Sequence, residues 1–189
     1  FRAGGAAMER FTSGDTNTGN ALAPALEEFR SPDAGKKEAV IAVLFTDIVG
    51  STKMIQTLGD EGAQRMVRLH NTVVRNALRE HQGAEVKHTG DGIMASFNSC
   101  PDAASCGVTI QKTLAAARAK DPDGTVLHLR VGINAGQPIV EEGDLTGTTV
   151  QIAAVIRDKA DTDGVFVSSS VRQNSPGSGI LFEDRGGFK

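Results

Sequence analysis

The sequence predicts an α/β sandwich, in which strands and helices alternate along the chain and pack in layers. Two observations carry this prediction. The unbroken apolar run from Ala39 to Phe45 is typical of a central strand that is covered on both faces. A later segment, residues 63–78, has apolar residues spaced three and four apart, as in a helix with one buried stripe. The fold class is therefore mixed, and an all-helical bundle is not expected.

The composition is that of an ordinary globular protein. The chain has 189 residues, of which 39% are hydrophobic and 23% charged, enough for one domain with a core. Residues 1–37 are rich in small and polar residues without a sustained period, so we expect a partly irregular linker, with one helix near Pro24 to Phe29. The folded domain is expected over residues 38–189, and whether it is truncated at its C-terminus stays open.

Charge and cysteine content exclude several classes of protein. The net charge of −3 provides no broad basic face, so no nucleic-acid partner is expected. Cys100 and Cys106 fit neither a zinc knuckle nor a redox pair, and we expect them to be reduced and partly buried. The longest clean apolar run is far shorter than a membrane span. We expect a cytoplasmic domain without membrane contact, although a longer protein has room for sensor or membrane segments elsewhere.

The first half of the domain reads as strand, helix and hairpin. After the first strand, Gly59 and Asp60 precede a long helix that Gly83 ends. The apolar face of this helix includes a histidine, for which we expect a core or interface role: Ala63, Met66, Val67, His70, Val73, Val74, Ala77 and Leu78. Glu85–His88 and Ile93–Phe97 are two predicted strands, joined by a tight turn that contains two glycines.

The second half repeats the alternation of helix and strand. Pro101 suits the first turn of a helix whose buried stripe is expected to be Ala103, Gly107, Ile110, Leu114 and Ala117. The segment Asp121 to Gly124 breaks the chain. The remaining predicted elements are a strand at Val126–Ala135 with a hairpin partner at Pro138–Glu141, a turn at Glu142–Asp144, a helix at Gly147–Ala160, a strand at Val165–Ser168, a short helix at Ser169–Gln173 and a last hairpin strand at Ile180–Phe188.

Two aspartates are the candidate metal ligands. Asp47 follows the first apolar strand, and Asp91 lies at the tip of the predicted hairpin. Carboxylates on neighbouring strand ends suit Mg²⁺ or Mn²⁺, with room for phosphate oxygens and water. Each aspartate alone has a commoner explanation, as a helix cap for Asp47 and as a turn residue for Asp91. Both explanations together are less convincing than a shared site.

The turn after Asp47 is a candidate phosphate-binding segment. Its residues are Ile48, Val49, Gly50, Ser51 and Thr52, and their backbone N–H groups lie where a helix is expected to begin. An aspartyl phosphatase needs a second acid two positions after its nucleophile, where this chain has Val49. No Gly-x-x-x-x-Gly-Lys-Ser/Thr loop is present, which argues against a P-loop enzyme. Ser168–Ser170 has no accompanying base and is expected to cap a helix.

Four ordered motifs together resemble the catalytic domain of class III nucleotidyl cyclases, the adenylyl and guanylyl cyclases. The resemblance covers residues 38–189. The motifs are Phe45-Thr46-Asp47-Ile48-Val49-Gly50-Ser51-Thr52, Val86-Lys87-His88-Thr89-Gly90-Asp91-Gly92, Arg130-Val131-Gly132-Ile133-Asn134-Ala135-Gly136 and Gly143-Asp144-Leu145-Thr146-Gly147-Thr148-Thr149-Val150.

The resemblance implies a ferredoxin-like βαββαβ core and a head-to-tail homodimer with shared active sites. One subunit would supply the metal ligands, Asp47 and Asp91, for two Mg²⁺ or Mn²⁺ ions, and the other would supply the residues that recognise the base. In this family the ribose 3′-hydroxyl attacks the α-phosphate, and the products are the cyclic nucleotide and pyrophosphate.

Lys87 and Asp144 match the two base-reading positions of the family. Adenine offers an acceptor at N1 and a donor at its amino group, whereas lysine only donates and ionised aspartate only accepts. Guanine presents the reverse pattern, which would leave like groups facing each other. ATP is therefore the expected substrate. Without the surrounding motifs, an exposed strand lysine and a turn-forming aspartate would be the simpler interpretations.

The helix after Asp144 departs from the family pattern Val-Asn-x-Ala-x-Arg. Gln151 stands at the asparagine position and keeps an amide that can orient the ribose, but Val155 replaces the arginine that stabilises transition-state charge. Arg157 is two residues further, about 200° around a helix, and is expected to point elsewhere. We therefore keep two hypotheses: an adenylate cyclase, weakened by Val155, and a catalytically impaired ATP-binding module that regulates or pairs with a partner subunit.

Overall fold

The computed structural model describes residues 39–120 and 127–187. The expected linker over residues 1–37, its helix near Pro24 to Phe29 and the chain break at Asp121 to Gly124 lie outside the described residues. No helix in the described ranges is both long enough and apolar enough to cross a membrane.

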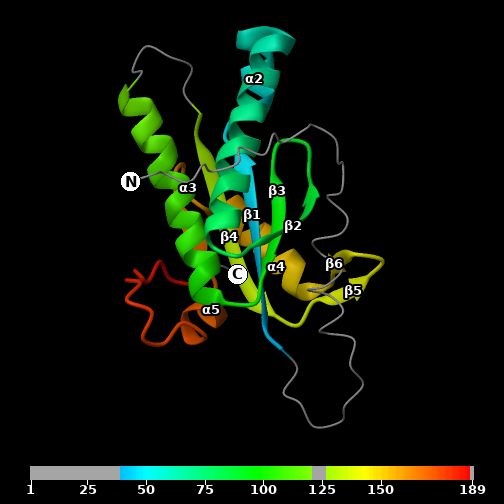
Figure 1. Cartoon of the computed structure of the whole chain (residues 1–189), viewed down its shortest axis with the longest axis vertical. Helices are drawn as coiled ribbons and strands as arrows, with labels where there is room; N and C mark the ends of the chain where they lie inside the picture. Colours follow the sequence, from blue (N-terminus) through cyan, green and yellow to red (C-terminus); the bar gives the residue numbers. More distant parts are fainter. Residues whose placement is uncertain (1–38, 121–126, 188–189) are drawn as a thin grey trace, which may run out of the picture.

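A five-stranded sheet forms the centre of the domain (Figure 1), and its strands follow the order β2-β3-β1-β4-β7. β1 pairs with β3 and with β4, and β2 pairs with β3, all antiparallel; β7 pairs with β4 in parallel. The bounds of these strands are β1 Ile41–Ile48, β2 Ala84–His88, β3 Ile93–Phe97, β4 Leu129–Gly136 and β7 Val165–Val167.

Helices cover both faces of the sheet. α2 (Ser51–Glu80) and α3 (Cys100–Lys120) lie together on one face, and α4 (Thr148–Lys159) lies on the other, as Figure 1 shows. The units β1-α2-β2 and β3-α3-β4 interlock in the sheet: β3 lies between β2 and β1, and β1 lies between β3 and β4. This arrangement is the ferredoxin-like βαββαβ core, and the predicted fold is confirmed. A separate hairpin of β5 (Ile139–Glu141) and β6 (Asp144–Thr146), and the short helix α5 (Ser169–Gln173), complete the described elements.

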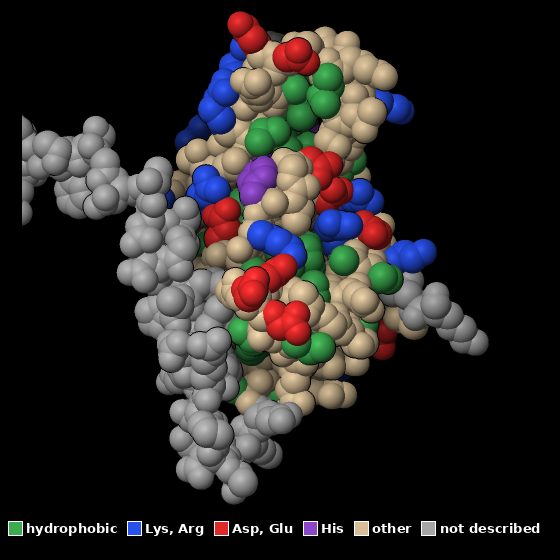
Figure 2. All heavy atoms as spheres, turned by 90° about the vertical axis from the view of Figure 1, so that its right-hand side faces the viewer, with side chains coloured by type: hydrophobic (Ala, Val, Ile, Leu, Met, Phe, Trp, Pro, Cys, Tyr) green, Lys and Arg blue, Asp and Glu red, His purple; other side chains and the backbone are tan. Residues whose placement is uncertain are grey.

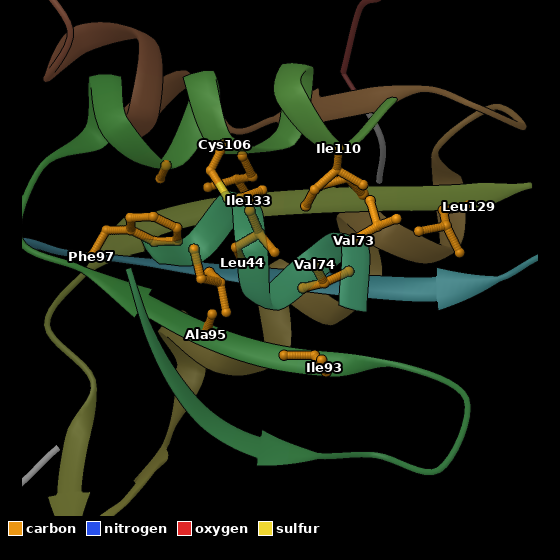
Figure 3. Packing of buried hydrophobic residues seen from close by; sticks show 14 of the residues in the cluster. Leu44, Val73, Val74, Ile93, Ala95, Phe97, Cys106, Ile110, Leu129 and Ile133 are labelled. Atoms are coloured by element: carbon orange, nitrogen blue, oxygen red, sulfur yellow. The ribbon is translucent and has the colours of Figure 1, made fainter. Parts of the chain in front are cut away.

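The alternation of side chains along β1 creates two cores. Ala42, Leu44 and Ile48 belong to the core beneath α2 and α3, whereas Val43 and Phe45 belong to the smaller core on the side of α4. Figure 3 shows the larger core: residues of α2 and α3 pack against the strands, among them the labelled Leu44, Val73, Val74, Ile93, Ala95, Phe97, Cys106, Ile110, Leu129 and Ile133. As expected, both cysteines are free and buried.

Several boundaries differ from the prediction near the first strand. β1 continues to Ile48, because its ladder with β4 extends through the pairs Asp47–Arg130 and Ile48–Leu129. Asp47 is thus the penultimate strand residue. Helix α2 begins at Ser51, and Gly59 (φ 65°, ψ 178°) interrupts it and separates a short first segment from the predicted long helix. Gln82, with φ 56°, takes the left-handed conformation after this helix, although Gly83 was the expected terminator.

Three predictions in the second half were wrong. β5 pairs with β6 and not with β4, because Glu142 and Gly143 both adopt positive φ and close a two-residue turn. Ala117 is exposed, since the last turns of α3 pack through Arg118, whose guanidinium donates to the Leu127 carbonyl and to Asp163. Residues 180–187 form no strand; Leu181 is 97% exposed and has no neighbouring sheet in the described chain to pack against.

Candidate active site

Asp47 projects from the end of β1 beside an arginine of the adjacent strand. Arg130 is its register partner on β4, and the Arg130 Nη2 donates to Asp47 Oδ2. The other terminal nitrogen of Arg130 donates to the Asp158 carbonyl at the end of α4, at 3.3 Å. The Asp47 side chain is 13% exposed, so a charge-assisted bond at this position is partly shielded from water. A carboxylate and a guanidinium therefore meet at one end of the sheet, on the side of α4.

The Asp91 turn is joined to the same end of β1. The Ile48 N–H donates to the Asp91 carbonyl at 3.2 Å, and the Ser51 hydroxyl donates to Asp91 Oδ2 at 2.7 Å. Gly92 makes this approach possible, because a Cβ there would lie 2.1 Å from the Thr46 carbonyl oxygen. The structure thus brings the backbones that carry Asp47 and Asp91 into direct contact at the beginning of α2.

The predicted phosphate-binding segment is the junction between β1 and α2. Gly50, with φ 71°, precedes the helix, and the first intrahelical bond runs from the Met54 N–H to the Gly50 carbonyl. N–H groups in the first turn of a helix have no intrahelical acceptor. The N–H groups of Ile48 and Val49 are already used, because they donate to the carbonyls of Asp91 and His128. Donors for an anion are therefore available from the helix start onward, at Ser51 and Thr52.

Lys87 and Asp144 form an ion pair on the other side of the β2–β3 hairpin. The Lys87 ammonium lies 2.6 Å from Asp144 Oδ2, and the Leu145 N–H donates to the second oxygen of Asp144 at 2.8 Å. Both side chains are exposed by more than 40%. Figure 2 views the molecule from the side on which β2, β5 and β6 lie in Figure 1, and it shows cationic and anionic side chains next to one another there. Residues 57 positions apart in the sequence are thus brought together at an accessible surface.

Helix α4 presents different residues to solvent and to the sheet. Gln151 is exposed, and Val155 is 51% exposed. Arg157 instead packs toward the sheet: its guanidinium lies over the Phe45 ring, 5.6 Å from the centroid, and donates to Asp158 at 2.7 Å. The expectation that Arg157 and Val155 point in different directions is confirmed. The Val155 side chain itself carries no charge.

The family model of the adenylate and guanylate cyclase catalytic domain matches residues 34–189. The chain belongs to this family. The match includes all four motifs and the elements that carry Asp47, Asp91, Lys87 and Asp144. The resemblance predicted from the sequence is therefore confirmed at the level of the family.

Individual cyclases are related to this domain at modest identity. A Rhizobium meliloti protein is 32% identical over 151 residues, which cover 79% of the chain and 26% of that protein. Adenylate cyclases of Mycosarcoma maydis and Streptomyces coelicolor are 32% and 29% identical over 69% of the chain, and the aligned parts are 6% and 32% of those proteins. The chain thus spans about a third or less of each relative.

Solved structures of cyclases share the fold. The crystal structure of an adenylate/guanylate cyclase/hydrolase from Silicibacter pomeroyi has a TM-score of 0.70 and 26% identity, and the superposition covers 78% of the chain and 86% of that structure. The adenylyl cyclase CyaB from P. aeruginosa has a TM-score of 0.63 at 20% identity, over 72% of the chain and 80% of CyaB. At such low sequence identity, the likeness to CyaB shows a shared fold.

Cyclases of this family generally use divalent metal ions. No group of three or more histidine, cysteine or acidic side chains that could hold a metal ion occurs within residues 39–120 and 127–187. Mg²⁺ commonly takes only one or two protein carboxylates and completes its shell with substrate phosphates and water. Asp47 and Asp91 at the start of α2 provide that kind of incomplete, hard-oxygen donor set.

The sequence motifs do not predict the role of one charged residue of the site, Arg130. Arg130 was recognised only as the first letter of a motif, and no role was assigned to it. Its contact with Asp47 follows from the pairing of β1 with β4, at a separation of 83 residues. The only local signal is an arginine in the second position of a strand that is otherwise apolar around it.

Proposed function

We propose that this domain is an adenylate cyclase that converts ATP to 3′,5′-cyclic AMP and pyrophosphate. The observation that carries the proposal is the junction of the Asp47 strand with the Asp91 turn at the first turn of α2. The two aspartates, the arginine beside Asp47 and the first N–H groups of α2 come from adjoining segments, and groups of these kinds are what a metal-bound triphosphate needs. The family of the chain supports the same conclusion.

Asp47 and Asp91 are the residues that would hold two Mg²⁺ or Mn²⁺ ions. When bound, such ions activate the attacking hydroxyl and neutralise charge on the phosphates. Side chains and N–H groups of the protein would position these ligands and the phosphates. Ser51 fixes one oxygen of Asp91, and Ser51 and Thr52 begin the helix that favours an anion at its N-terminus. Arg130 adds positive charge beside Asp47.

The Lys87–Asp144 pair supports ATP as the purine nucleotide. A lysine donor and an aspartate acceptor 2.6 Å apart match the acceptor N1 and the donor amino group that lie side by side on adenine. The pair is accessible, so the base can displace their mutual contact and take both partners. Gln151 on the following helix is assigned to the ribose.

A homodimer with shared active sites is the proposed assembly. Three large apolar side chains, Ile139, Ile152 and Val155, are exposed by 55%, 42% and 51% on β5 and α4. β5 pairs with β6, which carries Asp144, and α4 follows β6 in the chain. Exposed apolar side chains on such neighbouring elements are the kind of surface that a partner covers. A second copy in head-to-tail orientation would combine the metal ligands of one subunit with Lys87, Asp144 and Gln151 of the other.

We place the folded domain at residues 38–189 and expect it in the cytoplasm. The domain boundary is supported by the family match, which begins at residue 34, and by β1, which begins at Ile41. The buried thiols of Cys100 and Cys106 are free, as is usual in a reducing compartment. Burial raises the pKa of the Cys106 thiol to about 12, so it stays protonated and unreactive at neutral pH.

Val155 favours a second candidate function. Its exposed side chain provides no charge where the family's transition-state arginine would stand, and Arg157 is held against Phe45 and Asp158. An impaired ATP-binding module that regulates or pairs with a partner subunit would need the metal ligands and the adenine-binding pair. It would not need a positively charged side chain at position 155.

Turnover of ATP and of GTP, measured side by side against protein concentration with Mn²⁺, tests the proposal. An adenylate cyclase with shared sites should form cyclic AMP faster than cyclic GTP, and its specific activity should rise with concentration as dimers form. A protein that is dimeric and binds ATP but forms no cyclic AMP would instead be the impaired module.

A further inference from the structure

A chain of hydrogen bonds connects helix α2 to β1 and to the Asp91 hairpin. The Thr46 hydroxyl contacts His70 Nε2 at 2.9 Å, and His70 Nδ1 contacts Asn71 Oδ1 at 2.9 Å. The same Asn71 oxygen contacts His88 Nε2 at 3.0 Å. His88 Nδ1 receives the Gly90 N–H at 3.2 Å. The chain therefore begins one residue before Asp47 and ends one residue before Asp91.

The donors and acceptors along this series of hydrogen bonds fit one placement of the protons. Thr46 Oγ1 accepts the Ile93 N–H at 2.9 Å. Its own proton has two acceptors within reach, the Ile93 carbonyl at 3.5 Å and His70 Nε2 at 2.9 Å, and we assign it to the shorter contact with His70. His70 then carries its proton on Nδ1 and donates it to Asn71 Oδ1. His88 Nδ1 accepts from Gly90, so His88 donates from Nε2 to the same oxygen. Asn71 Oδ1 thus joins two imidazole donors through its two lone pairs.

Burial makes this arrangement costly to break. Thr46 and His70 are fully buried, so an unpaired polar atom on either would lose its water as well as its partner. Burial also lowers the pKa of His70; the bond to Asn71 opposes this effect, His88 and Arg75 add to it, and Asp91 opposes it. His70 is therefore neutral near pH 7, as the donor pattern requires.

A bulge in β2 presents the residues of the hairpin to two different faces. The register of β2 against β3 shifts between Glu85 and Lys87. Glu85 and His88 consequently both face α2, where Arg75 and Asn71 bind them from positions one helical turn apart. Lys87 faces the other side, where it meets Asp144. The contact between Asn71 and His88 thus fixes the end of β2 between the base-reading lysine and the Asp91 turn.

We propose that Asn71, His70 and His88 are positioning residues that hold the Asp91 turn against the end of β1 and so preorganise the metal site. The inference rests on the proposed function, because that function makes Asp91 a metal ligand. The contact between the Asp91 turn and the end of β1 can nevertheless be measured without catalysis. Asn71 is the central residue, because its one carbonyl oxygen accepts from both histidines. None of the three residues is assigned to touch the substrate.

Substitutions at Asn71 separate positioning from general stability. Asn71→Ala removes the shared acceptor, whereas Asn71→Asp keeps an oxygen for both imidazole donors. Asn76→Ala is the matched control, since Asn76 lies five residues further on the same helix and accepts a bond from exposed Arg79. His88→Ala removes the other end of the contact at an exposed position. The Asn71→Ala/His88→Ala double variant should be no worse than either single variant.

Amide hydrogen exchange is the first readout. In Asn71→Ala, the exchange of Gly90 and Ile93 should become about tenfold faster, while that of Ile133 in β4 stays unchanged. Asn71→Asp and Asn76→Ala should exchange like the wild type. Unchanged exchange at Gly90 and Ile93 in Asn71→Ala, or equal acceleration over the whole sheet, would overturn the inference.

Mn²⁺ affinity, measured by electron paramagnetic resonance in the presence of 3′-deoxy-ATP, is the second readout. This nucleotide lacks the attacking hydroxyl and cannot cyclise. Asn71→Ala should weaken Mn²⁺ binding about tenfold, as expected when a group behind a metal ligand is removed, and Asn71→Asp should restore it. Wild-type affinity in Asn71→Ala, or failure of Asn71→Asp to restore it, would contradict positioning. A wild-type protein without Mn²⁺ binding would refute the proposed function, and the exchange experiment would still decide the inference.

Discussion

At residue 155 the cyclase domain has a half-exposed valine, at the position where the resemblance of its sequence to class III cyclases implies an arginine. Val155→Arg should raise the rate of cyclic AMP formation by about a hundred- to a thousand-fold, because one preorganised charge-stabilising group is worth that much in a transition state. The measurement is kcat with saturating ATP and Mn²⁺.

Ile152→Arg is the matched control for this prediction, since Ile152 is similarly exposed on the same helix. It adds the same charge one turn away and should not accelerate the reaction. An unchanged kcat in Val155→Arg would mean that another group already stabilises the transition state.

The Lys87–Asp144 pair predicts the choice of base. The double variant Lys87→Glu/Asp144→Asn reverses the donor and acceptor pattern, so that it complements the N1–H and O6 of guanine. The ratio of kcat/KM for ATP to that for GTP should fall by about tenfold or more, since each polar group of the bound base that is left without a hydrogen-bond partner costs about 1–3 kcal/mol. A ratio that stays at the wild-type value would show that the base is recognised elsewhere.

At the scale of elements, the packing of α4 on the sheet depends on Gly132. A Cβ at this position would lie 2.1 Å from the backbone nitrogen of Arg157, so helix and strand are in backbone contact. Gly132→Ala should lower the free energy of unfolding by about 1–3 kcal/mol, the usual cost of overpacking, and should weaken activity by moving α4.

Chemical denaturation of Gly132→Ala and of Gly187→Ala measures this cost. A Cβ at Gly187 would meet no atom within 4 Å, so that variant should be as stable as the wild type. Equal stability of the two variants would show that α4 does not need the close approach.

Most elements were predictable because their signals are local. The apolar stripe of α2, the glycines of the Asp91 turn and the cap at Ser168, whose hydroxyl accepts the Val171 N–H, are all found as expected. The misplaced elements depend on partners instead. The pairing of β5 with β6 requires positive φ at Glu142, a conformation that is unusual for glutamate and has no signal in its own residue type.

The same distinction holds for the site. Asp47, Asp91, Lys87 and Asp144 were predicted because each stands in a motif. Two other features depend on the pairing of strands, which neither composition nor spacing reveals. The register of β1 against β4 places Arg130 beside Asp47. The bulge in β2 turns His88 toward Asn71 and so completes the link to His70.

At the scale of the whole molecule, each proposed active site needs residues from two chains. Asp91→Asn removes a proposed metal ligand, and Lys87→Glu/Asp144→Asn removes the proposed adenine-recognition pair. Neither protein alone should form much cyclic AMP. A head-to-tail heterodimer of the two contains one site with all the wild-type residues, so a mixture should recover up to about a quarter of the wild-type activity if the chains associate at random.

The recovery is measured by mixing the two proteins at equal concentration and following cyclic AMP with ATP and Mn²⁺. A mixture that is no more active than the separate variants, although mixed dimers are detected by mass, would contradict shared sites.

The most direct test of the central claim is the formation of cyclic AMP and pyrophosphate from ATP by the purified protein with Mn²⁺, compared with Asp47→Asn. We expect equal amounts of the two products from the wild type, and a loss of at least about a hundredfold in Asp47→Asn, because the substitution removes the charge of a proposed metal ligand. A wild-type protein that forms neither product, or an Asp47→Asn variant as active as the wild type, would contradict the claim.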